Sequence, residues 1–319
     1  MGQKDAIAAE NGRDAVRAID ADPAVCLVDT STPADGAVIA NPWQALRQFT
    51  AARIAQGRAG VSMPTEPQLA FQLAHAHARD AVHTPLDTFR LLQDLDTAGV
   101  APPASIVQLE SAAINRATYL QRPDLGRRLS AQSADRLVAL QGGRSTIEHA
   151  CDIALVLADG LSPLAINRQA PPFLAALQAA IAGYGWRVAP LTIVQQARVA
   201  IGDEIAALLG ARLVVVLIGE RPGLSAPDSM GLYMTWMPRV GLTDDSRNCI
   251  SNVREAGLQP VDAAALLQQL LVQAFARQLS GVQLKDTSRA AICAVDDGPQ
   301  FRLVPETVRA LPAPDKLTN

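Results

Sequence analysis

The spacing of apolar residues changes near residue 150, and this change predicts two kinds of structure. Before it, apolar residues recur every three to five positions, which is typical of helices. The predicted helices there cover about residues 41–57, 71–82 and 103–120. Beyond it, short apolar runs predict strands over residues 151–157, 191–194, 213–218 and 232–237. Three predicted helices separate or follow these strands. The first follows the strand over 151–157 and ends at Gly183, the second covers 199–209, and the third begins at Asp262. This alternation indicates an α/β fold whose mainly parallel sheet is covered on both faces.

Two turns at the ends of predicted strands are candidate ligand sites. Residues 159–162 and 219–223 follow apolar runs, and parallel sheets bind ligands at the carboxyl ends of their strands. Glu220 lies in the second turn, and two interpretations stay open: ligand contact, or an exposed carboxylate paired with Arg221. From residue type alone, Cys249 is interpreted as a half-buried thiol and Val199 as a core residue.

Composition narrows the class of protein. Of the 319 residues, 49% are hydrophobic and 18% are charged, so the chain can form a true core and is not globally disordered. A net charge of −3 lacks the basic excess that nucleic-acid binding needs. The weak charge favours an apolar surface that another chain covers. No CxxC pair and no apolar run long enough to cross a membrane occur, so we expect a cytoplasmic protein with reduced thiols.

Several common catalytic signatures are missing. The sequence contains no GxGxxG, GxxxxGK[ST] or GxSxG motif, which argues against the usual dinucleotide, P-loop and serine-hydrolase sites. His75, Arg79 and His83 share one helix face, where a solvated or partner-facing polar stripe is favoured over a metal site or proton relay. We therefore predict no catalytic residue and no metal ligand in this chain.

An ordered set of sequence blocks resembles the small subunit of ethanolamine ammonia-lyase. The resemblance covers about residues 42–285. Its blocks are residues 46–54, 74–83, 118–129, 159–162, 208–224, 238–239 and 249–252. Each block alone is weak, but their order and combination are highly specific. Residues 242–247 depart from the acidic stretch that usually precedes the last block.

The resemblance implies an adenosylcobalamin-dependent lyase that converts ethanolamine to acetaldehyde and ammonia by radical chemistry. It implies a hetero-oligomer in which the large subunit binds ethanolamine, while this chain closes the cobalamin site at the interface. The fold implied is a Rossmann-like domain that resembles other cobalamin-binding domains. Position by position, the implied cofactor contacts are Val199, Glu220 and Cys249, with Cys249 at the ring edge and not on cobalt.

These observations give a division of the chain and two rival functions. We predict a flexible arm (1–40), a helical N-terminal domain (41–130), a Rossmann-like cobalamin-contacting domain (131–300) and a C-terminal tail (301–319). The resemblance leaves open a location inside a bacterial microcompartment. The rival functions are a self-sufficient Rossmann-like enzyme acting on a small molecule and a non-catalytic interaction subunit. Neither nucleic acid nor membrane is expected as a partner.

Overall fold

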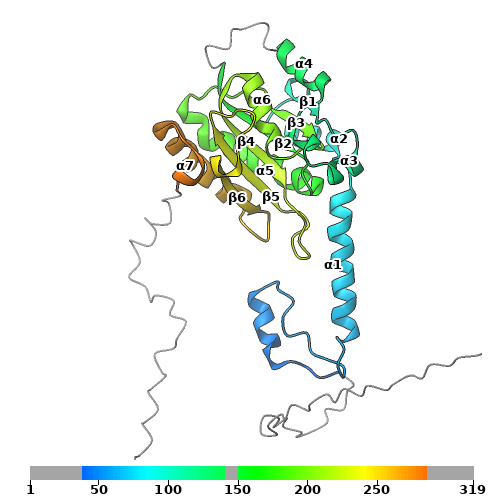
Figure 1. Cartoon of the computed structure of the whole chain (residues 1–319). Coiled ribbons are helices and arrows are strands. Elements are labelled where there is room, and N and C mark those ends of the chain that lie inside the picture. The colour runs from blue at the N-terminus through cyan, green and yellow to red at the C-terminus, as the bar shows by residue number, and fades with distance from the viewer. Residues whose placement is uncertain (1–37, 141–149, 286–319) are drawn as a thin grey trace, which may run out of the picture. The chain divides into compact units, whose positions relative to one another are not determined.

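The computed structural model describes residues 38–140 and 150–285, which fall into two compact units (Figure 1). The first unit ends at Pro67 and the second begins at Gln68. In the first, a 3-10 helix, η1 (Pro42–Phe49), follows Asn41, whose side chain accepts a hydrogen bond from the backbone N–H of Trp43. No residue of η1 is buried. The predicted tail, and all but residues 38–40 of the predicted arm, lie outside the described residues.

The second unit is built on a six-stranded mixed sheet in the order β1-β3-β2-β4-β5-β6. The strands are β1 (Val107–Glu110), β2 (Cys151–Ala158), β3 (Thr192–Gln195), β4 (Ala211–Gly219), β5 (Met230–Trp236) and β6 (Arg247–Val253). The first four strands in the sheet order pair in parallel, whereas β4–β5 and β5–β6 pair antiparallel. The α/β class is confirmed, and the parallel arrangement holds for four strands. A connection of ten residues joins β4 to β5, which is too short for a helical crossover and reverses the chain instead.

Helices cover both faces of the sheet (Figure 1). The helices are α1 (Thr65–His83), α2 (Thr88–Thr97), α3 (Arg116–Gln121), α4 (Ala131–Leu140), α5 (Pro163–Ile181), α6 (Ile201–Leu209) and α7 (Pro260–Arg277). On one face α2, α5 and α7 form a core with Ile153, Leu155 and Leu157 of β2. On the other face α4 and α6 form a second core with the alternate residues Ala154 and Val156. Burial on both faces explains the continuous apolar runs of β2 and β4.

The prediction of a single helix over residues 103–120 is wrong. Residues 107–110 form β1, which pairs with β3 at the edge of the described sheet, and α3 begins at Arg116. β1 has four residues that alternate between buried and exposed, so its apolar spacing is too short to distinguish a strand from a helix. The Rossmann-like resemblance and the domain boundaries at residues 41, 131 and 301 stay predictions.

Candidate functional site

The two predicted turns meet at the carboxyl ends of β2 and β4. The backbone N–H of Leu161 donates to the carbonyl of Gly219 over 2.9 Å. A Cβ on Gly219 would lie 2.0 Å from the carbonyl oxygen of Ser162, so no larger residue fits without moving one turn. Gly160 has a φ of +58°, a conformation that side chains rarely adopt. The backbones of the two turns are therefore in direct contact and lie side by side at the carboxyl ends of β2 and β4.

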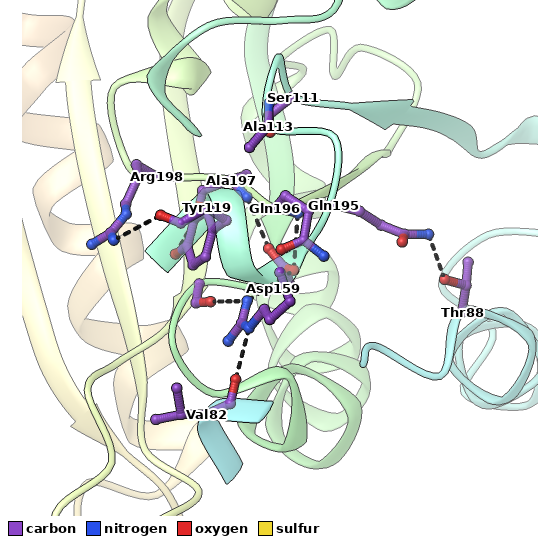
Figure 2. Close-up of polar contacts among 12 residues, drawn as sticks. Val82, Thr88, Ser111, Ala113, Tyr119, Asp159, Gln195, Gln196, Ala197 and Arg198 are labelled. Carbon is purple, nitrogen blue, oxygen red and sulfur yellow. Dashed lines mark hydrogen bonds and ion pairs between the residues drawn. The ribbon is translucent and has the colours of Figure 1, made fainter. Parts of the chain in front are cut away.

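Asp159, the first residue after β2, holds the loop after β3 (Figure 2). Its carboxylate is buried and accepts hydrogen bonds from the backbone N–H groups of Gln196 and Ala197, each over 2.9 Å. Arg116 forms an ion pair with it at 3.4 Å and also donates to the carbonyls of Gly160 and Val82. Burial raises the pKa of Asp159, although these hydrogen bonds and the charge of Arg116 favour the carboxylate.

Tyr119 completes this cluster from α3. Its ring lies between the guanidinium groups of Arg116 and Arg198, at 4.8 and 4.5 Å from the ring centroid. Its hydroxyl donates to the carbonyl of Ala197 over 3.1 Å, and burial raises the pKa of Tyr119 to about 12. Sequence reasoning missed Arg116 and Tyr119 as site residues. The cluster fixes residues 195–198, the segment that leads into Val199.

Glu220 directly follows β4 and lies against β5 and β6. Its carboxylate accepts a short hydrogen bond from the Ser229 hydroxyl and longer ones, of 3.3 and 3.4 Å, from the backbone N–H of Asn252. A Cβ on Gly231 would lie 2.9 Å from one carboxylate oxygen of Glu220. Among the described residues no ion pair joins Glu220 to Arg221. Gly231, which has no side chain, thus leaves room for the Glu220 carboxylate at the carboxyl end of β4.

Cys249 lies in β6, directly opposite Tyr233 of β5. Cys249 is exposed, whereas sequence reasoning from residue type expected a half-buried thiol. Neighbouring groups nevertheless partly desolvate the sulfur, and this desolvation, together with the negative charge of Glu220, raises the pKa of Cys249. Desolvation, Cys249 and Glu220 also raise the pKa of Tyr233. Glu220, Tyr233 and Cys249 are therefore electrostatic neighbours, and Cys249 is a neutral thiol at pH 7.

A buried ion pair connects the segments that carry Val199 and Cys249. Asp203 of α6 accepts two hydrogen bonds from Arg247 of β6, at 2.8 and 2.7 Å. Their side chains are only 1% and 2% exposed. Val199 lies two residues before α6, is half-buried and packs against the same core as Tyr233. The ion pair thus ties the beginning of α6 to the beginning of β6.

The remaining sequence candidates form no further site. His75, Arg79 and His83 are exposed on α1, as a polar stripe requires. Within residues 38–140 and 150–285, no three His, Cys, Asp or Glu side chains are grouped to hold a metal ion. No described helix is long and apolar enough to cross a membrane.

Comparison with known proteins identifies the family to which this chain is similar. Residues 40–285 match the model of the ethanolamine ammonia-lyase light chain family. A protein of Ralstonia nicotianae named ethanolamine ammonia-lyase small subunit is 55% identical over 265 residues, which cover 82% of this chain and 93% of that protein. Proteins of the same name from Azotobacter vinelandii and Pseudomonas putida are each 54% identical, covering 79% and 77% of this chain and 90% and 88% of their own lengths. The chain belongs to the family of the ethanolamine ammonia-lyase light chain.

Proposed function

We propose that this chain is the small subunit of an ethanolamine ammonia-lyase and contributes one wall of an adenosylcobalamin site at its interface with the large subunit. Family membership supports the enzyme assignment. The observation that carries the cofactor assignment is the Glu220 carboxylate at the open end of the sheet, beside the exposed Cys249. When bound, adenosylcobalamin supplies radical chemistry through homolysis of its cobalt–carbon bond.

The surroundings of Glu220 fit a ligand with amide donors. A carboxylate offers about four lone-pair positions. Only two donors use them in the described structure, the Ser229 hydroxyl and the backbone N–H of Asn252, which is shared between both oxygens at long distances, so Glu220 keeps acceptor capacity. A corrin ring carries primary amides around its edge, and a carboxylate accepts their N–H groups strongly. Glu220 would therefore bind and orient the ring through its amides.

Cys249 and Val199 fit supporting roles. The raised pKa of Cys249 keeps its thiol protonated at neutral pH, so it offers a small, weakly polar surface and not a thiolate ligand for a metal. Val199 offers a half-buried apolar surface beside the first turn of α6. In this proposal both residues pack against the ring edge and exclude water there, while the large subunit binds ethanolamine.

Helix α1 supports an interface with the large subunit. Of its 19 residues only Ala81 is buried, while Leu69, Phe71 and Leu73 are exposed. In proteins most helical stability comes from packing apolar residues against other elements, so these exposed side chains favour a partner that covers α1. We assign the large subunit as that partner, since the matched relatives are small subunits. The cytoplasmic or microcompartment location stays a prediction from the sequence.

Replacing Glu220 by Gln tests the cofactor assignment. In the complex with the large subunit, we expect Glu220→Gln to raise the Kd for cyanocobalamin about tenfold, because one charged acceptor becomes a neutral amide. Equilibrium dialysis measures the affinity, and gel filtration verifies that the complex assembles. Glu255→Gln, an exposed change of the same type, is the control and should leave the Kd unchanged. An unchanged Kd in Glu220→Gln would remove Glu220 from the site.

A further inference from the structure

A cavity of about 430 Å³ lies between the beginning of α6 and the beginning of β6. Ala200, which precedes α6, and Arg247, the first residue of β6, both line it. Ala200 is the neighbour of Val199. Arg247 lies two positions before Cys249, on the same side of the strand. The cavity therefore adjoins two of the three proposed cofactor contacts, although none of the three lines it.

Positive charge predominates in this cavity. Arg127, Arg128 and Arg247 line it together with Asp124 and Asp244. Asp124 is already paired with Arg122 outside the cavity, at 2.7 Å, and Asp203 neutralises Arg247. Across the described residues, the side chains of Arg127 and Arg128 have no ion pair or hydrogen bond. Two unneutralised guanidinium groups thus lie in a cavity whose other carboxylate, Asp244, already forms an ion pair with Arg247 at 3.6 Å.

Arg247 supplies an independent sign of a missing acceptor. The residue is 7% exposed, and its Nε has no hydrogen-bond partner within the part of the chain that the structure describes. Its ion-pair partner on this side is Asp244, whose carboxylate oxygen is 3.6 Å from Nε, which is too long for a hydrogen bond. A buried N–H without an acceptor is costly, so its presence in the lining points to a ligand oxygen.

The backbone holds Arg127 and Arg128 in place. On one side, the backbone N–H of Arg198 donates to the carbonyl of Gly126 over 2.8 Å. On the other, the backbone N–H of Leu129 donates to the carboxylate of Glu204 in α6 over 2.8 Å. The two arginines are therefore carried by a segment that is fixed at one end to the loop before α6 and at the other end to α6 itself, which lowers the entropy cost of binding.

We propose that this cavity binds a phosphate group, and that the phosphate is the phosphodiester in the nucleotide portion of the cobalamin. This inference rests on the proposed function, because it extends the same cofactor site. Guanidinium groups bind phosphate oxygens through paired, charge-assisted hydrogen bonds. Arg127 and Arg128 contribute those donors at the rim, and the Nε of Arg247 contributes one at the wall. The phosphodiester thereby anchors the nucleotide end of the cofactor while Glu220 binds the ring.

The test compares two corrinoids, since cobinamide has the corrin ring but lacks the nucleotide and its phosphate. In the complex with the large subunit, Arg127→Gln/Arg128→Gln is expected to raise the Kd for cyanocobalamin about 10- to 100-fold. The Kd for dicyanocobinamide is expected to stay unchanged. The control is Arg90→Gln/Arg277→Gln, which removes the same charge from the exposed surfaces of α2 and α7 on the opposite face of the sheet. The control should leave both Kd values unchanged.

The possible results separate the alternatives. Equal losses for cyanocobalamin and dicyanocobinamide, or no loss for either, overturn the phosphate assignment. Calorimetric titration with inorganic phosphate tests the other source: if the variant loses phosphate binding but keeps its cobalamin affinity, the cavity serves free phosphate and the proposal fails. If the double variant does not assemble, Arg127→Gln and Arg128→Gln singly should each show a smaller selective loss. A wild-type complex that binds no cyanocobalamin contradicts the proposed function itself.

Discussion

Asp203→Ala is expected to lower the free energy of unfolding by about 3–5 kcal/mol, because it leaves the buried guanidinium of Arg247 without its carboxylate. Arg247 donates to Asp203 through two nitrogens and also donates to the hydroxyl of Thr235. Burial lowers the pKa of Arg247, whereas the hydrogen bonds and charge of Asp203 raise it. Arginine stays protonated in proteins even without such a partner, so the variant contains a buried cation that has lost its main carboxylate. Urea denaturation of the full-length chain, followed by circular dichroism, measures the loss.

A double-mutant cycle distinguishes this pair from two independent contributions. Asp203→Leu/Arg247→Met removes both charges. We expect this double variant to be much more stable than the summed effects of Asp203→Leu and Arg247→Met, each measured alone, would predict. Asp94→Ala, which breaks the exposed pair with Arg90 on α2, is the control and should cost only about 0.3–0.5 kcal/mol. Additive single effects would show that the two side chains are not coupled.

Asp159→Asn is expected to have a destabilising effect of similar size, about 3–5 kcal/mol. Both carboxylate oxygens accept from backbone N–H groups, so an amide must turn its own NH₂ group toward one of these donors. The same change leaves Arg116 without its anion. Urea denaturation measures the stability. Hydrogen exchange at Gln196 and Ala197 should accelerate, because the loop before Val199 loses its anchor.

An exposed ion pair provides the control for Asp159. Asp124 pairs with Arg122 at 2.7 Å, and both side chains are more than half exposed. Asp124→Asn should therefore leave the unfolding midpoint and the exchange of Gln196 and Ala197 unchanged. If Asp159→Asn behaves like Asp124→Asn, then the buried cluster does not hold the loop after β3.

How far the fold could be predicted depends on how each strand is buried. β2 and β4 are buried on both faces, so their sequences are continuous apolar runs that mark them clearly. β1 and β6 are edge strands with polar positions between buried ones. β6, with the sequence RNCISNV, has no apolar run and is absent from the strands that the sequence predicts. Edge strands owe their structure to pairing with a distant neighbour, and a local pattern does not contain that neighbour.

Some residues of the candidate site could likewise be predicted from a local sequence pattern, and others could not. Glu220 could be singled out because it directly follows an unmistakable buried strand. Val199 and Cys249 have no such local signal, and only family resemblance singled them out. Arg116 and Tyr119 of α3 meet Asp159, which follows β2, only in the folded chain. Two sequence signals touch that cluster: the block over residues 118–129 includes Tyr119, and the turn over residues 159–162 includes Asp159.

The central claim, that this chain is one half of a two-subunit lyase, is tested most directly by reconstitution. Purified large subunit, this chain and adenosylcobalamin are combined with ethanolamine, and acetaldehyde is measured over time. We predict acetaldehyde only when both subunits and the cofactor are present. Full turnover by the large subunit and cofactor without this chain, or by this chain without the large subunit, would contradict the account.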